Sequence, residues 1–165
     1  MRQNNEYASV MRIGRVCEFS PEKHAARVLF PDIPGKISDW LPLLTPNSHA
    51  DKSEHYVDVD EHVVCLMSGQ GDEFGVILGS FYDGKNEPPF QTGNAHTLTY
   101  ADGTMIQYDR ASSTLSVHCV KDITIETDNG VKVKAGNDVE IEALNEVRIK
   151  AGVHIKLEAP RIDLN

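Results

Sequence analysis

The chain has 165 residues, of which 40% are hydrophobic and 7% aromatic, with a single tryptophan at position 40. This is enough apolar material for one core, but little for two independent ones. The formal net charge of −9 divides into −7 for residues 1–114 and −2 for residues 115–165, so neither part offers a basic face for phosphates, and nucleic acid is not expected as a partner.

The first 83 residues predict a short tail over 1–9 and a small barrel over 10–83. Two alternating runs flank Pro21-Glu22-Lys23, which predicts a long hairpin over 10–31. Strands resume in EHVVCLMS and EFGVILGSFYD, around a Gly69–Gly71 turn, after a long proline-rich loop. Five or so short strands with one long loop are typical of an OB-fold barrel.

The polar start MRQNNEYAS does not resemble a signal peptide, and no run of about 18 apolar residues occurs, so we expect a protein made in a cytoplasm without a membrane span.

The three cysteines, Cys17, Cys65 and Cys119, lie inside apolar alternation without a C-x-x-C spacing. We expect them to be small buried residues in a reducing compartment.

The C-terminal part, residues 96–165, comes after an expected linker over 84–95 and begins with a predicted hairpin around Asp102-Gly103. Pairs of apolar residues two apart then recur every eight residues, and the last pair comes one residue early. These pairs are Leu115/Val117, Ile123/Ile125, Val131/Val133, Val139/Ile141, Val147/Ile149, Ile155/Leu157 and Ile162/Leu164. Alternation of this kind predicts one short strand and one corner in each eight-residue unit, here called an octad.

Three architectures could use such octads: an antiparallel meander, a single-chain β-helix, and an intertwined β-helix of three chains. A single chain would need about 24 residues for each three-sided turn, which leaves too few turns for a core. Three chains around one axis would bury every apolar pair against its symmetry mates, so we favour a homotrimer with these pairs as its core. The outward charges alternate by octad, from Lys132/Lys134 to Glu140/Glu142 to Arg148/Lys150, and stacking would bring opposite signs together.

The chain resembles the phage baseplate assembly protein V family, the central spike of contractile tails, which is related to pyocin and secretion-system spikes. The stretches that carry the resemblance are RIGRV, RVLFPD, SDWLPLL, HVVCLMSGQGDEFGVILGSFYD, YADGTMIQYDR and the octads that end in APRIDLN. The resemblance implies a structural, non-enzymatic homotrimer of an OB barrel and a β-helical needle in the virion baseplate. It also implies contact with hub and tail tube proteins above and transient contact with the target envelope.

Members of that family often carry a His-x-His motif at the tip for an axial metal ion, whereas this chain has only His154, between Val153 and Ile155. No cofactor is therefore expected, and the alternatives at the tip are a separate PAAR-like protein over Ile162 and Leu164 or a metal ion held by His154. The spike of a pyocin-like or type VI secretion-like device, and an OB-fold binding module on an oligomeric stalk, remain alternatives to a phage spike.

Catalysis and calcium binding fit the sequence less well. The histidines are scattered and no nucleophile elbow, HExxH motif or phosphate loop occurs, so we do not expect catalysis. The segment Asp58-Val59-Asp60-Glu61-His62 is dense in oxygen ligands but lacks the glycine and distal glutamate of a calcium loop, so we interpret it as a solvated acidic turn.

Overall fold

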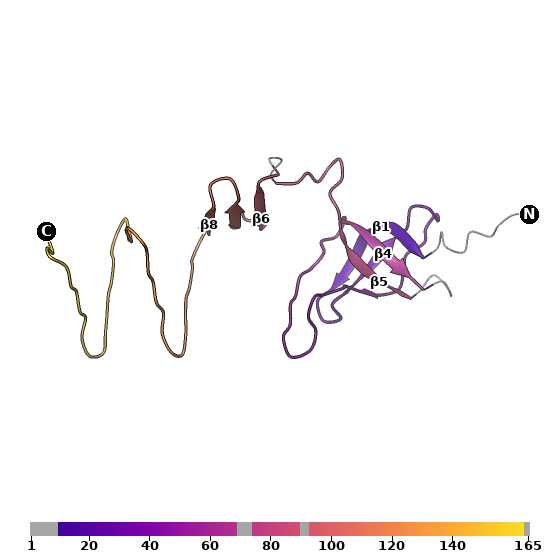
Figure 1. Cartoon of the computed structure of the whole chain (residues 1–165). Helices are drawn as coiled ribbons and strands as arrows, with labels where there is room; N and C mark the ends of the chain where they lie inside the picture. The colour runs from indigo at the N-terminus through magenta and orange to yellow at the C-terminus, as the bar shows by residue number, and fades with distance from the viewer. Residues whose placement is uncertain (1–9, 69–73, 90–92, 164–165) are drawn as a thin grey trace, which may run out of the picture. The chain divides into compact units, whose positions relative to one another are not determined.

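The structure is a computed structural model that describes residues 10–68, 74–89 and 93–163, and these residues contain strands and no helix (Figure 1). The all-β class expected from the sequence is confirmed. The chain divides into two compact units, Met1–Val120 and Lys121–Asn165. With no helix in the described parts, none of sufficient length and apolarity to cross a membrane is present there.

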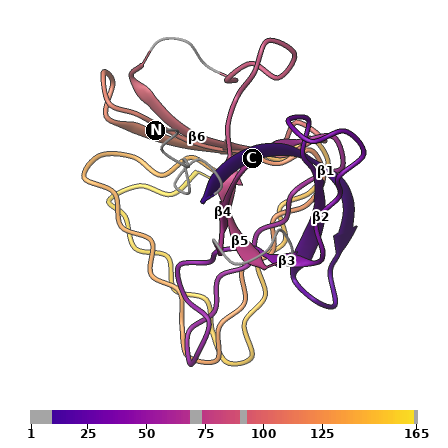
Figure 2. The ribbon, with the colours of Figure 1, turned by 90° about the vertical axis from the view of Figure 1, so that its right-hand side faces the viewer.

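The first unit contains a five-stranded sheet that closes almost completely on itself. Its strands are β1 (Met11–Ser20), β2 (Ala25–Leu29), β3 (Leu41–Pro42), β4 (His62–Met67) and β5 (Gly75–Ser80). They lie in the order β3-β2-β1-β4-β5, and every neighbouring pair is antiparallel. A parallel bridge between Leu43 and Ile77 joins the two edges, so the strands surround a common centre (Figure 2).

The predicted hairpin over 10–31 is confirmed as β1 and β2. Residues 21–24 form its turn, and His24 closes it with a left-handed φ of 48°. The register shifts between Val16 and Glu18, so Cys17 is an extra residue in β1. Alternation from buried Val16 places Cys17 outward, and the bulge keeps Glu18 outward as well. The prediction that all three cysteines are buried is therefore wrong for Cys17, whereas Cys65 is fully buried and Cys119 is partly buried.

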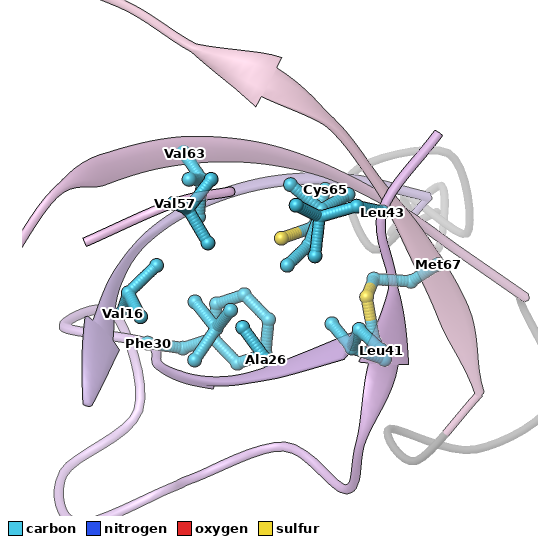
Figure 3. Packing of buried hydrophobic residues seen from close by; sticks show 11 residues of the cluster. Val16, Ala26, Phe30, Leu41, Leu43, Val57, Val63, Cys65 and Met67 are labelled. Carbon is cyan, nitrogen blue, oxygen red and sulfur yellow. The ribbon is translucent and has the colours of Figure 1, made fainter. Parts of the chain in front are cut away.

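The barrel interior holds an apolar cluster drawn from all five strands and the loops between them (Figure 3). Its members are Val16, Ala26, Val28, Phe30, Leu41, Leu43, Val57, Val63, Cys65, Met67 and Ile77. Alternation within β4 places Val63, Cys65 and Met67 inside and Leu66 outside. Burial in this cluster raises the pKa of the Cys65 thiol to about 11.

The long loop before β3 is tied to the barrel by a buried serine. Ser38 Oγ accepts a hydrogen bond of 2.9 Å from the backbone amide of Val28 and donates one of 2.7 Å to the carbonyl oxygen of Asp39. The Ser38 amide in turn donates to the carbonyl oxygen of Val28 at 2.9 Å. The predicted Gly69–Gly71 turn lies outside the described residues.

A second sheet comes next, with β6 (Ala95–Thr99), β7 (Met105–Asp109) and β8 (Thr114–His118) in antiparallel order β6-β7-β8. The predicted hairpin around Asp102-Gly103 is confirmed, with Gly103 at a φ of 91°. Asp102 Oδ1 accepts the amide proton of Thr104 at 2.9 Å, and this bond lowers the pKa of the Asp102 carboxyl. Residues 84–89 and 93–94 contain no strand, and β6 begins at Ala95, the last residue of the expected linker.

Residues 121–163, here called the coil, consist of extended segments joined by bends. The bends fall at 120–121, 128–129, 136–137, 144–145, 152–153 and 160. The trace zigzags between bends in Figure 1 and passes round an open centre in Figure 2, which is turned by 90°, so these residues wind as a coil. The bends recur with the eight-residue period of the apolar pairs, and the pairs from Ile123/Ile125 to Ile155/Leu157 each lie in a segment between two bends.

Candidate interaction surface

The apolar pairs of the octads are exposed along the whole described coil. Thirteen of the fourteen proposed core residues lie within the described residues, and their exposed fractions run from 48% at Ile162 to 76% at Val133. These thirteen are Leu115, Val117, Ile123, Ile125, Val131, Val133, Val139, Ile141, Val147, Ile149, Ile155, Leu157 and Ile162. The fourteenth, Leu164, lies outside the described residues.

The single chain therefore does not bury the residues that the sequence predicted as a core. Ile125, for example, is 74% exposed and Ile149 is 66% exposed. The physical reason is that one coil is a single layer of extended segments, and no other described segment of the chain covers these side chains. The prediction places their burial between three chains, and within one chain they form an apolar surface. Exposed apolar side chains in a repeated pattern are typical of surfaces that bind another protein.

The backbone of the coil likewise lies outside both sheets. No residue among 121–163 belongs to a strand of either sheet, although the segments between the bends are extended. Extended segments present a row of backbone donors and acceptors, and such groups are paired when they are buried. The coil therefore combines exposed apolar side chains with extended backbone segments that belong to neither sheet.

The first octad pair belongs to β8, and the structure extends its apolar face onto two further strands. Val117 lies opposite Ile106, which lies opposite Leu98; Leu115 lies opposite Tyr108, which lies opposite His96. Directly opposed residues point to the same face of a sheet, so these two rows share one face. Leu98, Ile106, Tyr108, Leu115 and Val117 are 41–66% exposed.

Sequence reasoning missed the contribution of β6 and β7 to this surface. The signal was present, because HTLTYADGTMIQY alternates around the Asp102-Gly103 turn. The Tyr100 amide donates to the Thr104 carbonyl oxygen at 2.9 Å, so residues 101–103 form a three-residue loop, and the length of this loop fixes which residues face each other. The opposite face carries Thr97, Gln107 and Ser116, and Gln107 Nε2 donates to Thr97 Oγ1 at 3.3 Å. One face of this sheet is therefore mostly apolar, whereas the other is mostly polar and includes Met105.

Ion pairs within the coil join residues two apart in the same segment. Arg148 Nη2 lies 2.9 Å from Glu146 Oε2, and Arg161 Nε lies 2.9 Å from Asp163 Oδ1, while Lys156 pairs with Glu158. Each pair flanks one apolar residue of an octad, here Val147, Leu157 and Ile162. Alternation thus places the charges on the face opposite the apolar pairs.

The acidic segment 58–62 forms an exposed turn beside a groove of about 550 Å³. The Asp60 amide donates to the Val16 carbonyl oxygen at 2.8 Å, and Asp60 Oδ1 lies 3.3 Å from Arg15 Nη1. The Asp58 amide donates to Glu61 Oε2 at 2.8 Å. These bonds use the carboxylates to hold the turn, and no group of three metal-ligating side chains occurs in the described residues.

At the other side of this turn, His62 Nδ1 contacts Asp83 Oδ2 and the His62 ring stacks on Phe81 with centroids 5.9 Å apart. Hydrogen bonds from the amides of Asn86 and Lys85, together with His62, lower the pKa of the Asp83 carboxyl to about 2. This cluster fastens the chain that leaves β5 to the start of β4.

His154, the one histidine of the coil, lies in the segment between the bends at 152–153 and 160. Its neighbour Val153 is 94% exposed at the bend, and Ile155 is one of the octad residues. A His-x-His pair is absent from the sequence, so the residues do not match the metal site that the family resemblance implied.

The amino-acid sequence is similar to that of a known phage protein. The chain is 27% identical over 97 residues to the "Spike protein" of Escherichia phage P2. The match covers 59% of this chain and 46% of that protein, so it spans about half the length of the relative. No family model matches the chain. At a coarse level the similarity supports the resemblance to phage baseplate spikes.

Proposed function

We propose that the protein is the structural spike of a contractile phage tail, a homotrimer in which an OB-type barrel precedes an intertwined triple-stranded β-helix. The similarity to a phage spike protein supports a structural role in the tail. The exposed apolar pairs of the coil, combined with extended segments that belong to no sheet, are the observation that carries the proposal.

The OB-type assignment rests on strand order. Strands β1 to β5 form a Greek-key sheet in which β1 lies between β2 and β4, and β3 approaches β5 in parallel through Leu43 and Ile77. The Leu44 amide reinforces this closure with a 2.9 Å hydrogen bond to the Ile77 carbonyl oxygen. A five-stranded, partly open Greek-key barrel is the OB architecture.

The exposed state of the single coil supports the intertwined β-helix. Three chains around one axis supply, for each extended segment, a neighbouring strand above and below, and place the apolar pairs against their symmetry mates. The face formed by Leu98, Ile106 and Val117 is a further apolar surface for burial between chains, because Val117 belongs both to β8 and to the octad series. Each fully buried aliphatic side chain contributes about 1.5–3 kcal/mol, three times per assembly.

In this role the trimer transmits force as a rigid rod. Its partners are the hub and tail tube proteins of the baseplate, a tip protein at the far end, and transiently the target envelope. The protein acts without catalysis, and its place is the tail of the virion after assembly in the host bacterium.

The native mass of the purified full chain tests the proposal. Three chains of 18.3 kDa give a species of about 55 kDa by native mass spectrometry or light scattering. A monodisperse monomer would remove the basis of the spike model, because the apolar face and the strand edges would then be stable in water.

A further inference from the structure

The corners of the coil carry a second eight-residue pattern, distinct from the apolar pairs. Asn129, Asn137 and Asn145 each occupy the second residue of a bend, at 128–129, 136–137 and 144–145. All three side chains are exposed. Three successive corners thus present the same amide side chain in the same position.

The backbone does not explain this choice of residue. Asparagine is usual at turns because it tolerates a left-handed φ. Within the described residues, however, the non-glycine residues with positive φ are His24, Asp60 and Ser113, all outside the coil. A left-handed φ is therefore not the reason for asparagine at these three bends.

In the proposed trimer, each asparagine side chain lies next to another one with which it can form hydrogen bonds. In an intertwined β-helix each octad occupies one level, and the next level on the same face is the following octad of a neighbouring chain. Levels are separated by about 4.8 Å, the spacing between hydrogen-bonded strands. Identical amides at this spacing donate and accept in a continuous ladder, as stacked asparagines do in cross-β assemblies.

The first residue of each bend indicates the same register independently. Leu144 is 100% exposed in the single chain, and Gly136 and Gly152 hold the equivalent positions in the octads before and after it. Stacking by one octad places Leu144 between the two glycines of neighbouring chains, where its side chain has room.

We propose that each of the three edges of the trimer carries an asparagine ladder, in which Asn137 of one chain lies between Asn129 and Asn145 of its neighbours, and that this ladder fixes the interchain register. The ladder ends at Val153, the next residue of the series. The inference rests on the proposed trimer and adds the residues that align its chains.

Cysteine pairs test the ladder directly. In the full chain with Cys17→Ser and Cys119→Ser, the double substitution Asn137→Cys/Asn145→Cys places thiols of different chains one level apart. A disulfide requires Cα atoms roughly 4.4–6.8 Å apart, so a spacing of about 4.8 Å allows it. The matched control, Asn129→Cys/Asn145→Cys, places them two levels apart, at roughly 9.6 Å, which does not.

Mild oxidation should convert the 137/145 variant into a covalent trimer on a non-reducing gel and leave the 129/145 variant uncrosslinked. Equal crosslinking of both variants, or of neither, in a protein whose native mass is three chains would overturn the ladder while the trimer stands. A monomeric unsubstituted protein would instead overturn the trimer itself.

A second pair of variants covers the case in which the cysteines prevent assembly. Asn137→Asp/Asn145→Asp stacks two carboxylates at neighbouring levels, whereas Asn129→Asp/Asn145→Asp adds the same charge with an amide between them. Neighbouring carboxylates raise each other's pKa, so the first variant should have a lower melting temperature than the second at pH 7. As the pH falls below about 5 the carboxylates become neutral, and its melting temperature should approach that of the unsubstituted protein. Equal melting of the two variants at pH 7 contradicts the ladder.

Discussion

Ile106 and Val117 lie directly opposite each other on β7 and β8, and both side chains are exposed on the same face of the sheet. Cross-strand pairs of aliphatic residues stabilise a sheet, and their contribution increases when the apolar face is removed from water. A substitution in this pair should therefore change stability little in a lone chain and strongly in an assembly that buries the pair.

Ile106→Ala should destabilise the protein by about 2–5 kcal/mol per chain if Ile106 is buried in the trimer, because a core aliphatic side chain is removed. An exposed isoleucine would change the free energy of unfolding by less than about 0.5 kcal/mol. Chemical denaturation at fixed protein concentration measures the difference. Gln107→Ala, one residue away on the polar face, is the matched control, and equal small effects would place Ile106 in solvent.

Ile141→Asp should prevent assembly, because it places three unpaired carboxylates together in a dry core. Glu140→Gln, the preceding residue on the opposite face of the same segment, should leave the trimer intact. Size-exclusion chromatography with light scattering separates the two results. If both variants assemble equally well, the inward and outward phases of the octads have been assigned the wrong way round.

Gly14→Ala tests the packing of the barrel, independently of assembly. A Cβ on Gly14 would lie 2.3 Å from Val28 Cγ1 and 2.8 Å from the Leu29 carbonyl oxygen, so the hairpin would have to open. Overpacking of this kind costs about 1–3 kcal/mol or more. Thermal melting should show the loss, whereas Gly84→Ala, where an added Cβ meets nothing within 4 Å, should be neutral or slightly stabilising.

Asp83 should contribute to acid sensitivity. Its pKa is lowered to about 2 by the amides of Asn86 and Lys85 and by His62, so its ionised form is favoured in the folded state. Its stabilising effect is complete above the unfolded pKa of about 4 and disappears as the pH falls towards about 2. Asp83→Asn should therefore lower stability at about pH 6 and reduce the difference in stability between about pH 6 and about pH 2.

The comparison for this prediction is Asp51→Asn, a substitution at an exposed residue elsewhere in the barrel. Unfolding by urea across the same pH range gives both curves. Parallel curves for the Asp83 variant and the unsubstituted protein would show that the hydrogen bonds around Asp83 do not stabilise the fold.

Local signals were enough to predict most strands and turns. The Pro21–Lys23 and Asp102-Gly103 turns and the eight-residue bends depend on residue types within a few positions of one another. The approach of Leu43 to Ile77 could not be predicted in the same way, because it joins residues 34 apart in sequence through tertiary packing. The bulge at Cys17 likewise depends on how β1 pairs with β2.

The interaction surface was predicted where the octads repeat and missed where they do not. Leu115 and Val117 stand at the start of the series, but Leu98 and Ile106 join them only because β6 and β7 pair in register with β8. A search for repeats along the sequence does not detect neighbours that pairing brings together. The assignment of the charged residues to the face opposite the apolar pairs rests on alternation alone and stays a prediction.

The spacing of the bends has a consequence for how the length of the protein can change. Removing or adding eight residues anywhere in the coil returns every later residue to the same position relative to its bend. A change of seven or nine residues instead moves the apolar side chains of each later segment to the face that carried the charged ones. Length can therefore vary in whole octads, about 4.8 Å at a time in a stacked needle, without redesign of the later segments. The bend at Pro160, after which Ile162 comes one residue early, marks the place where this modularity ends.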